Sequence, residues 1–338
     1  MKIYRSRAPV RITFGGGGTD VPPYDEKYGG LCLGATINKY VYSSLRKKKF
    51  DKRIKITSWD FNSLQSFNSI EDINYDGNVD LIKAAIKKMN PDFGFDLYVR
   101  SNVYPHSGLG ASASAAVSTI GVFNHLRDKD RLTSHQIAEL AYIIEDEEIK
   151  NISGRQDQYA ATFGGINLYE FHGGNFVLVN PLNLKKDYIL ELEKNLLIAY
   201  VGKRVKSSGE MHKTEKSMMN EKNVGRLHEI KRIAKDMEYS LRKGNLKDFG
   251  YLIKESWERK VAYNPNVTNQ HIDDLVETAL KNGAIGARLM GAGGGGHLLI
   301  YCNSNKEQIV AEKIEKMGAK IIFFSFDFTG LQTWEVNE

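Results

Sequence analysis

Apolar and polar residues alternate along several runs in the first half of the chain, and these runs predict β-strands. They cover residues 3–14, 31–45, 54–67 and 95–99. Residues 81–89 have the spacing of a short helix instead. The pattern therefore predicts a fold in which strands and helices are mixed along the chain, an α+β fold.

Two longer helices are expected between the strand at 95–99 and residue 148. In the first, apolar residues recur at helical spacing over residues 116–123. The second begins with Thr133-Ser134-His135-Gln136, which fits a capping box, and ends in four consecutive acidic residues, 145–148. Carboxylates at a helix C-terminus oppose the helix dipole, so this cluster requires either solvent or a bound cation.

The second half of the chain follows a charged connector, and we place a domain boundary near residue 190. Strands at 195–201, 297–301 and 320–326 are expected there, together with a long amphipathic helix closed by Gly244. This unit is also expected to be α+β, with strands paired across glycine turns. The two expected domains are residues 1–190 and residues 191–338.

A glycine-rich segment, residues 105–116, lies between a predicted strand and a predicted helix. Gly108 and Gly110 permit positive φ and a close backbone approach, and the small residues after them leave the first helical N–H groups uncovered. Such a helix start attracts phosphate. The expected nucleotide-binding residues are Pro105, Ser107, Gly108, Leu109, Gly110, Ala111, Ser112, Ala113 and Ser114.

Three other interpretations compete for this segment. It could be a closely packed Ala/Ser helix preceded by a turn. A phosphate loop of the G-x-x-x-x-G-K-[ST] kind is excluded because no Lys follows the glycines. A dinucleotide fingerprint matches Gly108, Gly110 and Ala113, but the stretch between the strand and the first glycine is too long for the tight turn of that motif. The hydroxyls of Ser112 and Ser114 favour a metal-bound triphosphate.

Two more glycine runs stand at residues 15–18 and 291–296. Four consecutive glycines near the start of a fold are entropically costly, so a ligand is expected to approach residues 15–20, although a flexible turn is the alternative. The later run also matches G-x-G-x-x-G, but a strand follows it in place of a helix. It therefore does not indicate a dinucleotide site.

Asp157 stands between two Gln residues just after a glycine, in Gly154-Arg155-Gln156-Asp157-Gln158. On sequence alone this Asp could be a helix N-cap. The acidic residues 145–148, which end the preceding helix, could likewise be a solvated end. Both positions become candidate chemistry only in combination with the glycine segments.

The composition is that of an ordinary soluble globular enzyme. The chain has 338 residues, of which 41% are hydrophobic and 26% charged, with a net charge of +6. The charges are mixed along the chain, so an anionic small substrate explains the basic excess and no nucleic-acid partner is expected. The two cysteines, Cys32 and Cys302, lie far apart in apolar runs, which favours buried free thiols in a reducing compartment.

Neither a signal peptide nor a membrane partner is expected. The first residues lack an apolar core of signal-peptide length, and no stretch approaches 18 apolar residues. A cytoplasmic location is therefore expected. The sequence leaves the oligomeric state open.

The three glycine segments, taken in order, resemble the three motifs of the GHMP kinase superfamily. Residues 8–15 are similar to the first motif, residues 105–116 to the phosphate-binding second motif and residues 289–296 to the third. The resemblance covers nearly the whole chain. It departs from the family pattern at Ala111, where many members have a serine, and at residues 15–20, where Gly-Gly-Gly-Gly-Thr-Asp replaces the Gly-Glu-His of many members.

This resemblance implies a fold, a reaction and a substrate class. It implies a ribosomal protein S5 domain 2-like N-terminal domain, a ferredoxin-like C-terminal domain, and ATP with Mg²⁺ bound between them. The first segment and the Gly154–Gly165 segment look most like those of D-glycero-D-manno-heptose 7-phosphate kinases, which implies phosphorylation of the anomeric hydroxyl in nucleotide-activated heptose synthesis for capsule or lipopolysaccharide. L-fucose kinases share part of the first segment, so another anomeric sugar kinase stays the alternative, with a non-catalytic sugar or nucleotide sensor more remote.

The resemblance also implies roles for individual residues. Asp157 would be the general base, with Arg11 as its partner. Ser112 and Glu145 would hold Mg²⁺, with Asp146, Glu147 and Glu148 left open for the metal carboxylate. The sugar would be bound by Gly16, Gly17, Thr19, Asp20, Gly293 and Gly294. The 7-phosphate would be bound by Arg7, Lys203, Arg204, Ser207 and Ser208, unless residues 203–208 are an ordinary basic loop.

Overall fold

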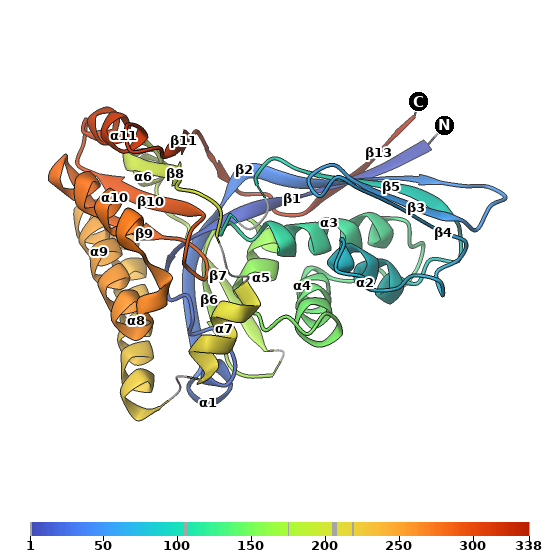
Figure 1. Ribbon diagram of the computed structural model, residues 1–338, viewed down its shortest axis with the longest axis horizontal. Coiled ribbons are helices and arrows are strands. Elements are labelled where there is room, and N and C mark those ends of the chain that lie inside the picture. Colours follow the sequence, from blue (N-terminus) through green and yellow to red (C-terminus); the bar gives the residue numbers. More distant parts are fainter. Residues whose placement is uncertain (1, 105–106, 175, 205–207, 218–219, 338) are drawn as a thin grey trace.

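The computed structural model describes residues 2–104, 107–174, 176–204, 208–217 and 220–337. The chain forms an elongated molecule with two halves, and its N- and C-terminal strands lie side by side at one end (Figure 1). Among the described residues, no helix is both long enough and apolar enough to cross a membrane.

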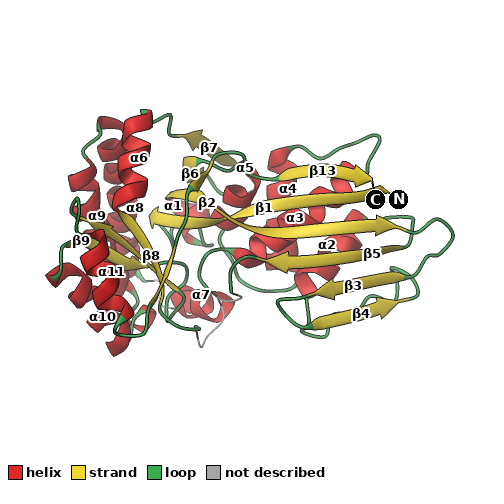
Figure 2. Cartoon of the chain, turned by 90° about the horizontal axis from the view of Figure 1, so that it is seen from above, coloured by secondary structure: helices red, strands yellow, loops and turns green. Residues whose placement is uncertain are grey.

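A large mixed sheet forms the first half. Its main path runs in the order β13-β1-β2-β5-β3-β4, as Figure 2 shows from above. The long strands β1 and β2 pair antiparallel, and the far end of β2 also pairs with β6 and β12. The strand bounds are β1 Lys2–Gly15, β2 Gly30–Lys47, β3 Ile54–Ser58, β4 Ser63–Phe67, β5 Phe95–Ser101, β6 Ile166–Phe171, β7 Val177–Pro181, β12 Phe326–Asp327 and β13 Gln332–Asn337.

Helices cover one face of this sheet (Figure 1). They bury an apolar face against it, with Val117 and Ile120 of α3 packed in the same core as Leu97 of β5. The expected capping box of α4 is confirmed, because Gln136 N donates to Thr133 Oγ1 while Thr133 N donates to Gln136 Oε1. The bounds are α1 Tyr24–Tyr28, α2 Asp80–Met89, α3 Ala111–His125, α4 Ser134–Ile143, a π-helical turn Ile144–Glu148 and α5 Gln156–Phe163.

The second half contains an antiparallel sheet in the order β11-β8-β10-β9. This strand order, with helices after the first and third strands in sequence, is the ferredoxin-like arrangement that was expected. The bounds are α6 Lys186–Asn195, β8 Leu196–Tyr200, α7 Ser208–Ser217, α8 Glu221–Lys243, α9 Leu246–Tyr263, a 3₁₀ turn Pro265–Val267, α10 Gln270–Lys281, β9 Ala284–Leu289, β10 His297–Cys302, α11 Glu307–Glu315 and β11 Lys320–Ile322.

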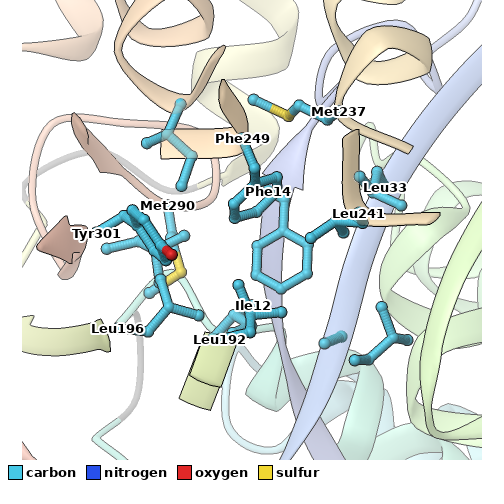
Figure 3. Packing of buried hydrophobic residues seen from close by; sticks show 14 of the residues in the cluster. Ile12, Phe14, Leu33, Leu192, Leu196, Met237, Leu241, Phe249, Met290 and Tyr301 are labelled. Carbon is cyan, nitrogen blue, oxygen red and sulfur yellow. The ribbon is translucent and has the colours of Figure 1, made fainter. Parts of the chain in front are cut away.

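The two halves share one hydrophobic core, shown in Figure 3. Phe14 at the end of β1 packs edge-on against Phe249 of α9, with ring centroids 5.2 Å apart. Phe249 in turn packs edge-on against Tyr301 of β10, and Met237 of α8 lies in the same cluster. Because this core joins β1 to the second sheet, the end of β1 and the loop after it are held against the second half.

The C-terminal segment departs from the expected division at residue 190. β12 pairs with β2, and β13 pairs with β1 over residues 332–337. The last strands therefore belong to the sheet of the first half, although they were expected in the unit 191–338. Alternation along β13 indicates a strand but does not say which sheet it joins.

Two further observations concern expectations from the sequence. Cys32 and Cys302 are buried and unpaired, as expected. Helix α7 begins at Ser208, and the sequence pattern does not predict it.

Candidate active site

The three glycine segments meet in one cleft between the two halves. A Cβ atom on Gly291 would lie 2.9 Å from Gly108 Cα, and one on Gly108 would lie 2.7 Å from the Met290 carbonyl oxygen. Side chains at these positions would force the segments apart, so glycine is required for the backbone contact. Gly17, Gly18, Gly108, Gly110, Gly291 and Ala292 border the cleft.

Helix α3 begins at the floor of this cleft. Gly110 is its N-cap residue, with φ of +74°, and no side chain caps the first turn. Ser112 is exposed and borders the cleft, and the Ser107 hydroxyl is buried with no hydrogen-bond partner in the described chain. The helix start is thus a set of N–H and O–H donors facing a cavity, which suits an anionic ligand.

Leu109 and Ser114, which were also expected to bind nucleotide, face away from the cleft. The Leu109 side chain is fully buried, and its carbonyl accepts a hydrogen bond from Arg11 N at 3.0 Å. The Ser114 hydroxyl donates to the Pro9 carbonyl at 2.9 Å. These two residues fix the helix against β1. Pro105 lies outside the described residues.

Asp157 and Arg11 form a bidentate ion pair within the cleft. Arg11 Nε and Nη2 lie 2.7 Å from the two carboxylate oxygens of Asp157, and Arg11 Nη1 also donates to the Gly108 carbonyl. Arg11 is buried, whereas 23% of the Asp157 side chain is exposed. A Cβ atom on Gly110 would lie 3.0 Å from Asp157 Oδ2, so the carboxylate stands directly beside the start of α3.

Asp157 is not an N-cap, the alternative that the sequence left open. Helix α5 has Arg155 as its N-cap, and Asp157 lies inside the first turn. Arg155 turns away from the cleft and contacts Glu139 and Asp25 at 3.3 Å each. At the start of this helix, Arg155 therefore contacts carboxylates outside the cleft, whereas Asp157 borders the cavity.

Glu145 lies in the π-helical turn after α4 and borders the cleft from the side of α5. It accepts hydrogen bonds from Asn151 Nδ2 at 3.0 Å and Gln158 Nε2 at 2.8 Å. Burial, and then the negative charge of Asp157, raise the pKa of its carboxyl to about 7. A π-turn inserts an extra residue into a helix, and such turns often occur at functional sites.

The other members of the acidic cluster are placed differently. Asp146 accepts a long hydrogen bond from Ser153 N, at 3.4 Å, and Glu147 is exposed. Glu148 is held by Lys88 at 3.1 Å and by the Tyr75 hydroxyl at 2.8 Å. Of the four carboxylates, Glu145 is the one that borders the cleft.

The residues present fit a magnesium ion that is held jointly with a bound nucleotide. Within the described ranges there is no group of three or more His, Cys, Asp or Glu side chains that could hold a metal alone. Mg²⁺ commonly uses one or two protein oxygens together with phosphate oxygens and waters. Glu145 and Ser112 border the same cleft and supply such oxygens.

The loop after β1 divides into a part that supports itself and a part that faces the cleft. The fully buried Thr19 hydroxyl donates to the Gly16 carbonyl at 2.8 Å and accepts from Leu31 N at 2.9 Å. Asp20 accepts from Gly18 N and from Gln156 Nε2, each at 3.1 Å, and borders the cleft with Gly17. Thr19 and Gly16 therefore shape this loop but do not reach the cavity.

The expected cationic residues separate in the structure. Arg204 is 6% exposed and borders the cleft, and its Nε atom has no partner among the described residues. Burial, and then the charge of Arg11, lower its pKa. Lys203 is exposed and does not border the cleft.

Arg7 is not brought to the cleft. It donates to Gln332 Oε1 at 2.6 Å and stacks 4.2 Å from the centre of the Tyr40 ring. Arg7 lies four positions before Arg11 along the strand, which corresponds to roughly 13 Å. Ser207 lies outside the described residues, and Ser208 begins α7 with a side chain that lies outside them too.

Gly293 and Gly294, expected at the substrate, lie behind the cleft. A Cβ atom on Gly293 would lie 2.5 Å from Val267 Cβ, and Gly294 N donates to the Val267 carbonyl at 2.8 Å. The third glycine segment instead reaches the cleft through Gly291 and Ala292.

Two basic residues of the cleft, Lys260 and His212, are not predicted from the sequence. Lys260 stands on the buried side of α9, in register with Ile253 and Trp257. A lysine in an apolar stripe is a usable signal, because an unpaired buried charge is costly. His212 lies on α7, a helix that the sequence pattern does not predict.

A second hollow continues from the cleft past Ser112 and Arg204. It lies between the sheet and helices α2 and α3, with the buried Ser58 hydroxyl and the Asp60 carboxylate at its border. The apolar residues at its border are Val41, Phe61, Val79, Leu81, Ile82, Val99, Val103, Ala111, Ala115 and Ile149. A flat, partly apolar group attached to a phosphate bound at α3 would fit here.

Comparison with known proteins gives consistent matches along the chain. Residues 80–165 match the family description "GHMP kinases N terminal domain", and residues 237–320 match "GHMP kinases C terminal". The D-glycero-alpha-D-manno-heptose 7-phosphate kinase of Campylobacter jejuni is 33% identical over 99% of this chain and 100% of its own length.

Two further relatives differ in how much they share. The crystal structure of a D-glycero-D-manno-heptose 1-phosphate kinase from Bacteroides thetaiotaomicron superimposes with a TM-score of 0.82 at 28% identity, covering 99% of this chain and 100% of that one. The L-fucokinase/L-fucose-1-P guanylyltransferase of Bacteroides fragilis is 24% identical over 93% of this chain but only 36% of its own length.

Proposed function

This chain belongs to the GHMP kinase family and is an ATP-dependent sugar kinase, and we propose that its substrate is D-glycero-D-manno-heptose 7-phosphate. The reaction would move the γ-phosphoryl group of ATP to the anomeric hydroxyl and give the 1,7-bisphosphate. The observation that carries the proposal is the Arg11–Asp157 pair beside the uncapped start of α3, in a cleft lined by all three glycine segments.

Asp157 would accept the proton of the anomeric hydroxyl. Its carboxylate is partly exposed to the cleft, while Arg11 fixes its orientation with two hydrogen bonds. The guanidinium also supplies a positive charge directly beside the carboxylate that would accept the proton. Arg11 further contacts the Gly108 carbonyl, so base and phosphate loop are held in one unit.

The triphosphate would lie at the start of α3. The first N–H groups of the helix, the Ser107 hydroxyl and the guanidinium of Arg204 face the region where the phosphates would bind. The hollow beyond Ser112 would take the base and ribose. Arg204 stands where cleft and hollow meet, so we now favour the triphosphate as its ligand over the sugar 7-phosphate.

Glu145 and Ser112 would hold Mg²⁺ together with the phosphates. When bound, the ion neutralises charge on the phosphoryl oxygens. Glu145 is a buried carboxyl with a raised pKa, and its side chain accepts hydrogen bonds from the amide groups of Asn151 and Gln158. A cation there would favour the ionised carboxylate, which burial and Asp157 otherwise disfavour.

The sugar would lie between the loop after β1 and helix α5. Asp20 would accept hydrogen bonds from sugar hydroxyls, and Gln156, already bound to Asp20 and to Thr13, would hold that carboxylate in place. In the cell, we place this reaction in the cytoplasm, in nucleotide-activated heptose synthesis for capsule or lipopolysaccharide.

A coupled assay of ADP release over a panel of sugars tests the proposed function. We expect the highest kcat/KM with D-glycero-D-manno-heptose 7-phosphate, compared with the same heptose without phosphate, with heptose 1-phosphate and with L-fucose. A preference for L-fucose would favour the partial match to the fucokinase. Binding of ATP and sugar without turnover would indicate a non-catalytic sensor.

A further inference from the structure

We infer that Lys260 and His212, held by Glu215, bind the terminal phosphate of the sugar substrate. This inference rests on the proposed function, because it names the site that would recognise the 7-phosphate. The three residues come from helices α7 and α9 of the second half, and none of them was expected from the sequence. Lys260 and His212 both border the cleft, and Lys260 lies at the loop after β1.

Lys260 places its ammonium group beneath that loop. Its Nζ atom lies 3.1 Å from Glu215 Oε1 and 3.5 Å from the Gly17 carbonyl oxygen. A Cβ atom on Gly18 would lie 3.3 Å from the same Nζ atom. The ammonium is therefore next to the segment that would contact the sugar, although only 5% of the Lys260 side chain is exposed.

His212 is oriented by the other oxygen of the same carboxylate. Its Nδ1 atom lies 3.1 Å from Glu215 Oε2, so the hydrogen on Nδ1 points to Glu215. The second ring nitrogen, Nε2, is then the one that can meet a ligand. In the imidazolium form it offers an N–H to a phosphate oxygen while the bond to Glu215 persists.

Glu215 acts as a positioning residue for both cations. It is almost completely buried, and Asn264 Nδ2 also contacts it at 3.4 Å. One carboxylate that divides its oxygens between a lysine and a histidine fixes both but leaves each with a further donor position. The Glu215–Lys260 ion pair also avoids the cost of an uncompensated buried lysine before substrate binds.

The distribution of the other cations in the cleft favours this assignment. Arg11 is paired with Asp157 in bidentate geometry, and Arg204 lies toward the start of α3 and the adjoining hollow. Lys203 does not border the cleft. Lys260 is thus the cleft cation at the loop that would contact the sugar. His212 shares the Glu215 carboxylate with it and is also close enough to Glu145 to lower the pKa of that carboxyl. A dianionic phosphate bound beside them needs positively charged donors.

The test compares heptose 7-phosphate with unphosphorylated heptose in two variants, Lys260→Met and His212→Gln. Glutamine can still donate to Glu215 but carries no charge. We expect each variant to lower kcat/KM for heptose 7-phosphate by roughly tenfold to a hundredfold, the size of a lost charge-assisted hydrogen bond. The kcat/KM for unphosphorylated heptose and the KM for ATP should change by less than about threefold. The matched control is Lys213→Met, which replaces an exposed lysine on α7, the helix that carries His212.

Lys260→Met leaves Glu215 buried without its lysine, so the double variant Lys260→Met/Glu215→Gln removes both charges together. It should show the same selective loss in a folded protein. An equal loss with both sugars, or a rise in the KM for ATP, would overturn the inference and leave the proposed function standing.

Calorimetric titration without ATP separates the test of the phosphate site from the test of the proposed kinase reaction. Wild-type protein should bind heptose 7-phosphate more tightly than heptose, and the variants should lose that difference. Equal wild-type affinity for the two sugars would overturn the phosphate site. Tight binding of heptose 7-phosphate with no ADP release from wild type would refute the proposed function but not the site.

Discussion

Two buried glutamates at this cleft, Glu145 and Glu215, show how the same side chain takes opposite electrostatic roles. Burial raises the pKa of Glu145, the charge of Asp157 adds to the effect, and the pKa reaches about 7. Burial opposes ionisation of Glu215 as well, but Lys260 and then His212 overcome it and lower the pKa to about 2. Glu215 is in direct contact with Lys260 and His212. Glu145 instead has amide donors and a nearby carboxylate, and the charge of His212 lowers its pKa only as the smallest contribution.

We propose from this contrast that the cleft has a reacting end, at Glu145 and Asp157, and a substrate-reading end, at Lys260 and His212. At the reacting end, Glu145 and Asp157 lie close enough to repel each other, which is favourable only when a cation joins them. At the other end, the charges are balanced inside the protein. Substitutions at the first end should change turnover and metal dependence, and those at the second should change folding stability and sugar affinity.

Asp157→Ala should give the largest effect on catalysis. Removing the general base should lower kcat by about 10²–10⁴-fold, while the affinity for ATP stays nearly unchanged because the start of α3 keeps its donors. Steady-state kinetics and nucleotide titration measure the two quantities. The control is Asp128→Ala on the exposed turn after α3. Activity comparable to wild type would refute the assignment of the base.

Glu215→Gln should give the largest loss of stability. It leaves Lys260 buried without its carboxylate, so the free energy of unfolding in urea should fall by on the order of 3 kcal/mol. Glu145→Gln serves as the matched comparison, because it removes a charge that burial disfavours, and it should not lose a comparable amount. Equal losses of unfolding free energy in the two variants would contradict the proposed electrostatic difference between Glu215 and Glu145.

The ion pair between Glu215 and Lys260 predicts that folding stability depends on pH. The pKa of Glu215 is lower in the folded protein than its ordinary value of 4.5, so its stabilising contribution is full above that pH and is lost as the pH falls toward 2. Wild type should therefore lose more unfolding free energy over this range than Glu215→Gln does. Parallel curves for the two proteins would show that Glu215 is not held ionised by its neighbours.

The variant Glu145→Gln tests whether Glu145 is a magnesium ligand. If this carboxylate holds Mg²⁺, the variant should need at least about tenfold more Mg²⁺ for half-maximal activity, since even residues that only support metal ligands cost that much. Glu147→Gln, an exposed member of the same cluster, is the control. An unchanged magnesium requirement in Glu145→Gln would move the metal to another residue.

Arg204→Ala should have a smaller effect, which is confined to the binding of the nucleotide. Loss of a buried guanidinium near the triphosphate should raise the KM for ATP by about tenfold, with the KM for heptose 7-phosphate nearly constant. A rise in the sugar KM alone would return Arg204 to the sugar phosphate, the ligand first expected for it.

The sequence predicts the path of the chain better than it predicts the partners of its charges. The strands at 3–14 and 31–45 and the capping box at Thr133 follow from local spacing, and the glycine segments meet because only glycine permits their backbone contact. β13 could not be assigned to its sheet, since pairing with β1 joins the two ends of the chain. Such long-range pairing leaves no local signal.

The candidate site shows the same limit. Asp157, Arg11 and Glu145 could be named because they lie in or next to recognisable motifs, and the structure brings all three to the cleft. Arg7 stands in the same strand as Arg11 but is tied to Gln332, far along the chain. Lys260 is separated by long stretches of sequence from the loop that it supports, so only the fold reveals that contact.

The most direct test of the proposed reaction is the structure of its product. Wild-type protein with ATP, Mg²⁺ and D-glycero-D-manno-heptose 7-phosphate should give a sugar bisphosphate whose new phosphorus is coupled to the anomeric proton in a phosphorus NMR spectrum. A new phosphate on any other carbon, or ADP without a bisphosphate, would contradict the proposal that Asp157 activates the anomeric hydroxyl in this cleft.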